Sequence, residues 1–190
     1  MDSVPLDYRI ETPRLVLRMS AKEETDFVWD ATRHPGFNDG MLWNMPESKE
    51  ELDEFVGNVP ERWLSGDGYL FTFRDKAKDE PLGRIVLERR CGGWNAGFWT
   101  HPRYQGAGYA TEALGGVLEF AFEGLGLKAV GACHAEWNVA SRAVLERNGF
   151  RFKLRIEEGF EKDGEWIAQD SLSINRDQWL ALRQASASNR

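Results

Sequence analysis

The start of one predicted helix carries the residue types that most directly suggest a bound ligand. Between a predicted strand and that helix runs the segment His101-Pro102-Arg103-Tyr104-Gln105-Gly106-Ala107-Gly108-Tyr109-Ala110-Thr111-Glu112. Small residues allow backbone N–H groups to converge on a ligand, and the N-terminus of a helix carries about half a positive charge. The segment therefore favours a phosphate or pyrophosphate site, with a plain strand-to-helix turn as the alternative.

Two well-known phosphate-binding loops do not fit this segment. The dinucleotide fingerprint Gly-x-Gly-x-x-Gly/Ala has Thr111 at its sixth position here, and hairpins precede it where that fold requires a parallel βαβ unit. The P-loop is excluded because the chain contains no Gly-Lys-Ser/Thr sequence.

A different pattern does fit. Arg103-x-x-Gly106-x-Gly108, after a strand and at the opening of a helix, resembles the acetyl-CoA motif of the GNAT acyltransferases. A second motif begins 32 residues after Gly106 as Asn138-Val139-Ala140-Ser141 and ends in Asn148-Gly149-Phe150. The opening Glu11-Thr12-Pro13-Arg14-Leu15-Val16-Leu17-Arg18 looks like the RimJ/RimL-like branch, which acetylates N-terminal amines of ribosomal proteins. The resemblance runs from about residue 9 to residue 180.

The resemblance implies an acyl-CoA-dependent N-acyltransferase that uses acetyl-CoA as co-substrate and needs no metal. The backbone of residues 98–100 would pair with the pantetheine arm, and one N–H there would polarise the thioester carbonyl. Backbone N–H groups of residues 105–110 would hold the pyrophosphate. The implied cofactor-binding residues are Phe98, Trp99, Thr100, Arg103, Gln105, Gly106, Ala107, Gly108, Tyr109, Ala110, Asn138 and Ser141.

Catalysis in this family would be direct attack of an amine on the bound thioester in a ternary complex. Relatives often protonate the leaving thiolate with a tyrosine, but Leu145 occupies that position here and cannot donate a proton. The resemblance to the ribosomal-protein branch points to Ser141 instead, and Asn138 would bind the pantetheine amide. The alternatives are a helix N-cap for Asn138 and an ordinary first-turn residue for Ser141.

The general base is not carried over, because Asn95 stands where relatives often have glutamate. Glu136 and His134 are candidates by position, at the end of the strand before Asn138, although each could equally be a solvated or capping residue. A peptide α-amine with a pKa near 8 is roughly a tenth neutral at pH 7. A lysine amine with a pKa of about 10.4 is far more fully protonated and needs much more assistance to lose its proton. This difference favours an α-amine or another amine of low pKa as the acceptor.

The acceptor groove should lie over the thioester, between the first two helices, the loop of residues 37–43 and a late hairpin. The predicted substrate-binding residues are Trp29, Met41, Trp43 and Phe160, with core packing as the alternative for Trp29. The acceptor could be a protein N-terminus, a polyamine or small amino metabolite, or an aminoglycoside-like drug.

The elements that must position these residues are read from hydrophobic periodicity, capping boxes and turn residues. The expected strands are 14–19, 69–74, one around 85–87, 94–100, 129–135, 150–156 and 166–174. The expected helices follow capping boxes at Ser20–Glu23 and Ser48–Glu51, then span 107–123, 138–148 and 178–183. The order β-α-α-β-β-β-α-β-α-β-β predicts a single α/β (α+β) domain over residues 9–183. It would hold a mixed, mostly antiparallel sheet of about seven strands flanked by helices, with a frayed tail over 184–190.

Composition excludes several classes of function. The 190 residues include 31 acidic and 24 basic side chains, a net charge of −7, which argues against nucleic acid as a partner. Cys91, expected in a turn, and Cys133 cannot form a disulfide framework, and neither has a partner at zinc-ligand spacing. The N-terminus does not resemble a signal peptide, and no stretch reaches the roughly 20 apolar residues of a membrane span. We therefore expect a cytoplasmic monomer or homodimer whose acidic surface suits a cationic amine.

Two other classes of function remain open at this point. The residues at Leu145 and Asn95 are compatible with a catalytically inactive CoA-binding sensor or interaction module. A dinucleotide-dependent oxidoreductase would bind NAD in place of CoA. Thiol release from acetyl-CoA in the presence of amines, and thermal shifts with each cofactor, distinguish these classes.

Overall fold

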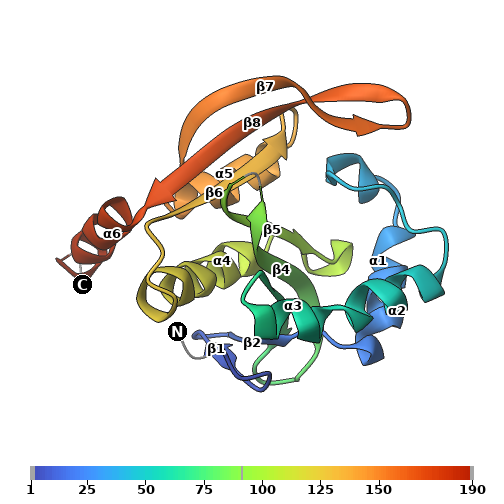
Figure 1. The fold of residues 1–190 in the computed structure, drawn as a ribbon, viewed down its shortest axis with the longest axis horizontal. Coiled ribbons are helices and arrows are strands. Elements are labelled where there is room, and N and C mark those ends of the chain that lie inside the picture. Colours follow the sequence, from blue (N-terminus) through green and yellow to red (C-terminus); the bar gives the residue numbers. More distant parts are fainter. Residues whose placement is uncertain (1–2, 91, 189–190) are drawn as a thin grey trace.

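The computed structural model describes residues 3–90 and 92–188, arranged as one curved sheet with helices on both faces (Figure 1). The strands are β1 (Arg9–Glu11), β2 (Leu15–Met19), β3 (Gly68–Asp75), β4 (Pro81–Arg90), β5 (Gly93–Thr100), β6 (Ala129–Ala135), β7 (Arg151–Lys162) and β8 (Glu165–Asn175). The helices are α1 (Thr25–Thr32), α2 (Lys49–Gly57), α3 (Val59–Ser65), α4 (Tyr109–Glu119), α5 (Val139–Arg147) and α6 (Arg176–Ser188). Short turns of helix are η1 (Lys22–Glu24), η2 (Asn38–Gly40), η3 (Pro102–Tyr104) and the π-helical η4 (Phe120–Gly124).

The sheet has eight strands in the order β1-β2-β3-β4-β5-β6-β8-β7, which confirms the expected mixed, mostly antiparallel architecture. The strand beyond the expected seven is β1, whose three residues are too few for a periodic signal. Helix α3, with Pro60 in its first turn, is separate from α2 rather than part of one longer helix. The domain boundary at 9–183 stays a prediction.

The central feature of the sheet is the junction between β5 and β6. These two strands are parallel and are paired only at Asn95 and Gly131, whereas β4 and β5 form a ladder along the whole of β5 (Figure 1). A Cβ atom on Gly131 would lie 2.8 Å from Asn95 Oδ1, so a larger residue there would require the Asn95 side chain to shift. Beyond Asn95 the strands diverge, and the β6-facing edge of β5 has no strand partner in the described part of the chain.

The main hydrophobic core lies between one face of the sheet and α4. Leu15, Leu17, Phe71 and Ile85 come from the strands, and Leu114 comes from α4; each is at most 1% exposed. Side chains alternate between the two faces of a strand, so the residues between these positions face the other side, toward α1, α2 and α3.

Three local details differ from the predictions. Ser20 does not cap a helix: it is buried at the end of β2, and its hydroxyl lies 2.8 Å from the Thr72 hydroxyl, while Ala21 precedes η1 without a side-chain cap. Helix α6 continues to Ser188, beyond the helix end expected at residue 183, consistent with the high helix propensity of Ala185. The helix expected over 107–123 begins at Tyr109 and changes to a π-helical turn at Phe120.

The regular alternation predicted for β7 is also wrong. Phe152 pairs with Leu172 and Leu154 pairs with the adjacent Ser171, so a bulge at Lys153 places these two apolar side chains on opposite faces. Arg155 of the same strand forms ion pairs with Asp170 and Glu136.

The second capping box is partly confirmed. Ser48 accepts a hydrogen bond from the Glu51 N–H, but the Glu51 carboxylate accepts from Glu47 instead of returning to Ser48. None of the helices within residues 3–90 and 92–188 is long and apolar enough to cross a membrane. Cys91 lies outside the described residues.

Candidate active site

A cavity of about 880 Å³ lies where β5 and β6 separate. Its walls include Arg84, Val86 and Trp99 from the face that carries α1–α3, and His134 and Ser141 from the face that carries α4 and α5. Because residues from both faces line one cavity, the cavity passes through the sheet at the gap between the two strands. A ligand bound on the α4–α5 side can therefore meet a second ligand that enters from the α1–α3 side.

The α1–α3 side of the cavity is closed by the segment after η2. Met41, Leu42 and Trp43 line the cavity there, together with Phe55 and Val59 of the following helices. Two side chains from the other half of the molecule hold η2, which directly precedes this segment. Asn138 Nδ2 donates to Gly40 O at 3.0 Å, and Lys162 Nζ donates to Asn38 O. Figure 1 shows η2 beside the tip of the β7–β8 hairpin, which carries Lys162.

The loop before α4 has the geometry expected of an anion site. Gly106 and Gly108 both have φ of +79°, a left-handed conformation that glycine adopts without steric cost. Gly108 is the N-cap of α4, and no side chain caps the helix, so its first backbone N–H groups remain available. The cap and the glycines thus satisfy the local requirements for holding a pyrophosphate.

Arg14 fixes this loop from the N-terminal strands. Arg14 Nη1 donates to Ala107 O at 3.0 Å, Arg14 Nε pairs with Glu112 Oε2 at 2.6 Å, and the guanidinium lies 4.7 Å from the centre of the Tyr109 ring. Thr12 Oγ1 donates to Glu112 Oε1 at 2.6 Å. Glu112 is therefore the anchor that links the N-terminal motif to the loop.

The pKa of Glu112 reflects this network. Burial raises the pKa of the carboxyl group, but the hydrogen bonds from Thr12 and Arg14 and the charge of Arg14 outweigh burial, and the pKa lies below its ordinary value. The carboxylate is therefore charged at neutral pH and balances the nearby guanidinium.

The N-terminus of α5 carries the predicted second motif. Asn138 is the N-cap: its Oδ1 accepts from the Ser141 N–H at 3.0 Å while its Nδ2 binds Gly40. Ser141 lines the cavity, and Leu145 is fully buried in the core. The alternative reading of Asn138 as a helix cap is thus part of the structure, and its role toward pantetheine stays a prediction.

The two candidate bases lie in different surroundings. His134 lines the cavity and is 2% exposed; its Nδ1–H donates to Ala135 O at 2.7 Å, so Nε2 holds the free lone pair of the neutral ring. That Nε2 atom is buried without a hydrogen-bond partner. Glu136 is not among the lining residues, and its carboxylate is paired with Arg155 at 2.9 Å. The geometry favours His134 over Glu136.

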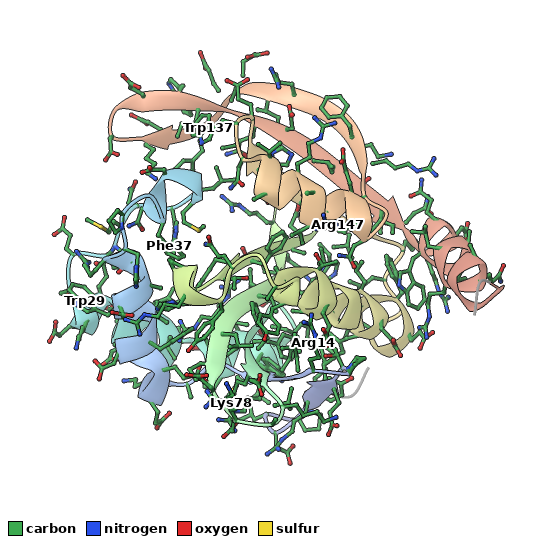
Figure 2. The ribbon with its side chains drawn as sticks, turned by 180° about the vertical axis from the view of Figure 1, so that it is seen from behind. Arg14, Trp29, Phe37, Lys78, Trp137 and Arg147 are labelled. Atoms are coloured by element: carbon green, nitrogen blue, oxygen red, sulfur yellow. The ribbon has the colours of Figure 1, made fainter. Side chains whose placement is uncertain are left out.

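The other predicted site residues are divided between the cavity and its surroundings. Phe98, Trp99, Met41 and Trp43 line the cavity, whereas Phe160 lies next to the lining residue Gly159. Trp29 does not line it: the ring projects from the outer part of α1 and packs 3.7 Å under the Arg33 guanidinium (Figure 2). Phe37, from the following loop, instead points inward against Trp99 (Figure 2).

The residues just before the loop make contacts of their own. Gln105 Nε2 donates to Thr100 O at 3.1 Å. The side chain of Arg103 turns toward α1, where Nη2 lies 3.0 Å from Asp30 Oδ2. Their predicted contacts with the coenzyme, like those of Ala110, stay predictions.

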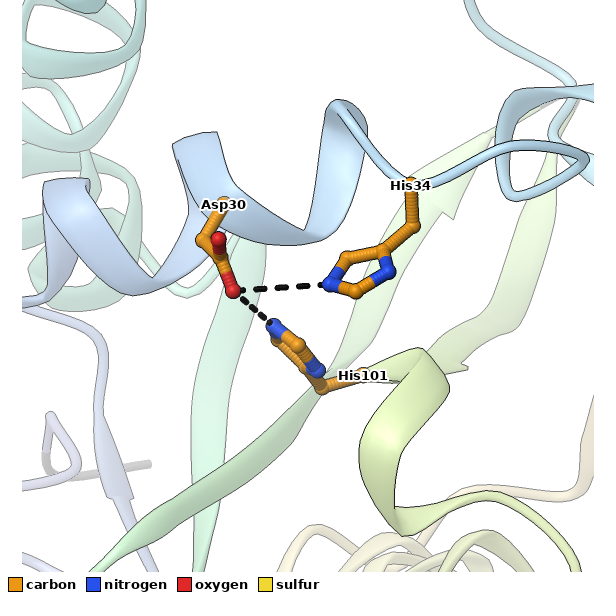
Figure 3. Close-up of side chains that lie close together, drawn as sticks. All are labelled: Asp30, His34 and His101. Atoms are coloured by element: carbon orange, nitrogen blue, oxygen red, sulfur yellow. Dashed lines mark hydrogen bonds and ion pairs between the residues drawn. The ribbon is translucent and has the colours of Figure 1, made fainter.

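A cluster that sequence reasoning missed joins α1 to the end of β5. Asp30 Oδ2 lies 3.0 Å from His101 Nε2 and 3.5 Å from His34 Nε2 (Figure 3). His101 Nδ1 accepts from the Arg103 N–H at 3.3 Å, so the neutral ring carries its proton on Nε2 and donates it to Asp30. Burial lowers the pKa of His101, which favours this neutral form. The three side chains thus form a cluster in which Asp30 pairs with both histidines and with the Arg103 guanidinium.

Arg84 is a second residue that was missed, although it interrupts the apolar run of β4. It lines the cavity and is 4% exposed, and its Nε and Nη2 have no hydrogen-bond partner. Trp43 Nε1 is also buried without a partner in the same cavity. A charged residue within Gly83-Arg84-Ile85-Val86-Leu87 was the signal that could have revealed the site.

Comparison with known proteins assigns the family. A family model described as an acetyltransferase (GNAT) domain matches residues 14–151. The chain is 26% identical over 177 residues to the uncharacterized N-acetyltransferase YnaD of Bacillus subtilis (strain 168), covering 90% of this chain and 98% of YnaD.

Solved structures share the fold. Mycobacterium smegmatis RimJ, in complex with CoA-disulfide, has a TM-score of 0.78 at 20% identity and covers 95% of this chain and 93% of its own. The ribosomal-protein-S5-alanine acetyltransferase from Vibrio fischeri has a TM-score of 0.76 at 18% identity, with 91% and 99% covered. With the family model spanning both sides of the cavity and the loop before α4, this chain belongs to the GNAT family and is an N-acetyltransferase.

Proposed function

We propose that the protein transfers an acetyl group from acetyl-CoA to a primary amine, in a ternary complex assembled across the sheet. The observation that carries this proposal is the single cavity that passes between β5 and β6 and has an uncapped helix N-terminus beside it. The gap accommodates a narrow thioester arm from one face and an amine from the other.

The coenzyme would enter from the α4–α5 side. Its pyrophosphate would accept hydrogen bonds from backbone N–H groups of residues 105–110, and the pantetheine amides would bind the open edge of β5 at Phe98–Thr100. A backbone N–H of that edge would then donate to the thioester oxygen as negative charge develops. RimJ, which shares the fold, has been solved with a CoA-disulfide.

The acceptor would enter beneath the segment of Met41–Trp43. We propose a protein N-terminal α-amine as the acceptor, because the opening motif resembles the RimJ/RimL-like branch and a neighbour in fold is a ribosomal-protein-S5-alanine acetyltransferase. A small amine is the alternative. Such a reaction fits the expected cytoplasmic location.

Two proton transfers complete the reaction. His134 Nε2, which holds the free lone pair, would accept the proton that the amine loses on attack. Ser141, which lines the cavity from the first turn of α5, would donate a proton to the departing thiolate. Neither step requires a proton donor at position 145, where the Leu145 side chain is buried in the core.

An acceptor panel tests the proposal. Acetyl-CoA is mixed with N-terminal peptides, polyamines and aminoglycosides, and free thiol is followed together with acetylated product by mass spectrometry. Thiol release with a peptide α-amine is expected. Tight CoA binding without thiol release from any amine would instead indicate an inactive sensor.

Ser141→Ala tests the assigned proton donor. Loss of a general acid lowers kcat by about 10²–10⁴-fold, and the KM for acetyl-CoA should change little because the Ser141 N–H still caps α5 through Asn138. Ser141→Thr retains the hydroxyl and should recover most of the rate. An unchanged kcat in Ser141→Ala would remove the residue from the mechanism.

A further inference from the structure

Arg84 is a buried cation on the wall of the cavity. On β4 it alternates with the core residues Ile85 and Leu87, so its side chain lies on the α1–α3 face, beside Thr72 of β3 and Trp99 of β5. Only 4% of the residue is exposed, and it lines the cavity. The guanidinium thus lies beside the edge where the thioester and the amine would meet.

The guanidinium lacks a full counterion within the described residues. Glu24 Oε2 lies 3.9 Å from Arg84 Nη2, beyond hydrogen-bond distance, and Nε and Nη2 have no hydrogen-bond partner. Glu24 is already engaged, because Arg74 Nη1 lies 2.8 Å from its Oε1 and the Thr72 hydroxyl donates to its Oε2. Burial lowers the pKa of Arg84 to about 10, so the group is still charged at neutral pH.

The surroundings of Arg84 provide donors and little negative charge. Trp43 Nε1 is a second buried donor without a partner on the same cavity. Of the lining residues in the described ranges, Glu88 is the one acid, and Arg62 Nη2 already binds it at 2.8 Å. A ligand in this cavity is therefore met by unpaired N–H donors and positive charge.

We propose that Arg84 binds a carboxylate of the reacting pair. This inference rests on the proposed acyl transfer and adds the class of substrate: either the amine acceptor carries an acidic group near its amine, or the acyl group of the thioester ends in a carboxylate. A carboxylate forms paired, charge-assisted hydrogen bonds with a guanidinium. It would satisfy the two unpaired donors and neutralise a cation that is only 4% exposed.

Calorimetric titration of the full chain separates the two sources without requiring turnover. In one arm, with CoA present, Asp-Ala-Ala amide is compared with Asn-Ala-Ala amide, peptides that differ in one carboxylate. In the other arm, succinyl-CoA is compared with acetyl-CoA. The wild type should bind the acidic member of one pair at least about tenfold more tightly. Arg84→Met should abolish that preference, and Arg84→Lys should retain part of it.

Arg74→Met is the matched control. Arg74 has a side chain that is 11% exposed and shares Glu24 with Arg84, but it does not line the cavity, so its loss should leave the acid preference intact. Without ligand, Arg84→Met should melt no lower than the wild type, because it removes a cation without hydrogen bonds, whereas Arg74→Met should melt lower.

The outcomes are distinct. The proposal is overturned if the wild type prefers the acidic member in neither arm, or if Arg84→Met keeps the preference. Thiol release with acetyl-CoA and a neutral amine is measured in parallel. Its absence counts against the proposed transferase reaction, whereas a lost acid preference with transfer retained concerns Arg84 alone.

Discussion

At the scale of single residues, the environment of each candidate base decides its chemistry. His134 has one nitrogen committed to a backbone carbonyl and the other buried without a partner, while Glu136 is held by Arg155. Both residues are candidates by position, at the end of the strand before Asn138. The sequence could not distinguish them, because the tautomer of His134 depends on the orientation of its ring toward the neighbouring Ala135 carbonyl, and the ion pair of Glu136 depends on Arg155, which is distant in the chain.

We predict that His134→Gln lowers kcat by about 10²–10⁴-fold, the usual contribution of a general base. Glutamine keeps a similar size and can still bind a backbone carbonyl, so the affinity for acetyl-CoA should be retained. Steady-state kinetics of this variant and of Glu136→Gln show directly which of the two residues contributes more to kcat. A larger loss in Glu136→Gln would assign the base to Glu136 and contradict the prediction.

Arg84 is a residue of the cavity wall that the sequence did not predict. The net charge of −7 suggested a cationic acceptor, but composition does not show where charges lie, and the cavity wall carries unpaired positive charge. Trp29 is the converse case: it is an aromatic residue on the expected helix, but none of the residues of α1 lines the cavity, and its ring packs against Arg33 instead.

At the scale of elements, the glycines before α4 carry the strongest prediction. In Gly108→Ala the left-handed conformation costs about 1–2 kcal/mol, and relief of that strain would redirect the first N–H groups of α4. We expect the Kd for acetyl-CoA to rise by about tenfold or more, measured by calorimetry.

Gly92→Ala is the control for Gly108→Ala. Gly92 has φ of +77° in the β4–β5 turn, with open space around its Cβ position, so it pays the same conformational cost away from the loop. Both variants should lose similar stability in urea, and only Gly108→Ala should lose affinity. Equal Kd values in the two variants would contradict a role of the loop in coenzyme binding.

The anchor formed by Glu112 predicts how the free energy of unfolding depends on pH. Its folded-state pKa is lowered, so it contributes stability above the unfolded pKa near 4.5, and that contribution is lost as the pH falls through the folded pKa. Glu112→Gln should cost about 1–3 kcal/mol near pH 7. Urea unfolding at several pH values should show the gap between wild type and variant closing below about pH 4.5. A gap that stays constant with pH would be inconsistent with an ionised Glu112.

Elements with a strong local signal were the ones that sequence patterns predicted. The strand at Leu15 and Leu17, the strand at Ile85 and Leu87 and the helix after Ser48 all formed as expected. The alternation of apolar residues in β7 did not predict their faces correctly. A bulge, which depends on the pairing of β7 with β8, places the apolar side chain that follows Phe152 on the opposite face of the sheet. Similarly, Ser20 bonds across the sheet to Thr72 rather than along its own chain.

At the scale of the whole molecule, the sheet consists of two parts that meet at one residue pair. Strands β1–β5 form one part, β6–β8 the other, and Asn95 with Gly131 joins them. Side-chain bonds from Asn138 to Gly40 and from Lys162 to Asn38 add a second connection over the cavity. The order of the elements predicted both parts, but the length of the ladder between them follows from tertiary packing.

A ligand that fills the gap should stabilise both parts together. We predict that CoA at about one hundred times its Kd raises the free energy of unfolding by about 2.7 kcal/mol. Hydrogen exchange should slow in β5 and also in β6 and α5. Protection confined to the loop before α4 would contradict binding between the strands.

In the proposed binding mode, two separate places would contact the acyl donor: the open edge of β5 and the start of α4. The gap between β5 and β6 would align the thioester through the pantetheine amides, without contacts to the nucleotide. The diphosphate would be bound separately, at the start of α4. A pantetheine thioester without its nucleotide would therefore be aligned much as acetyl-CoA is. Loss of the nucleotide should weaken binding of the donor and leave the rate of acyl transfer from the bound donor unchanged.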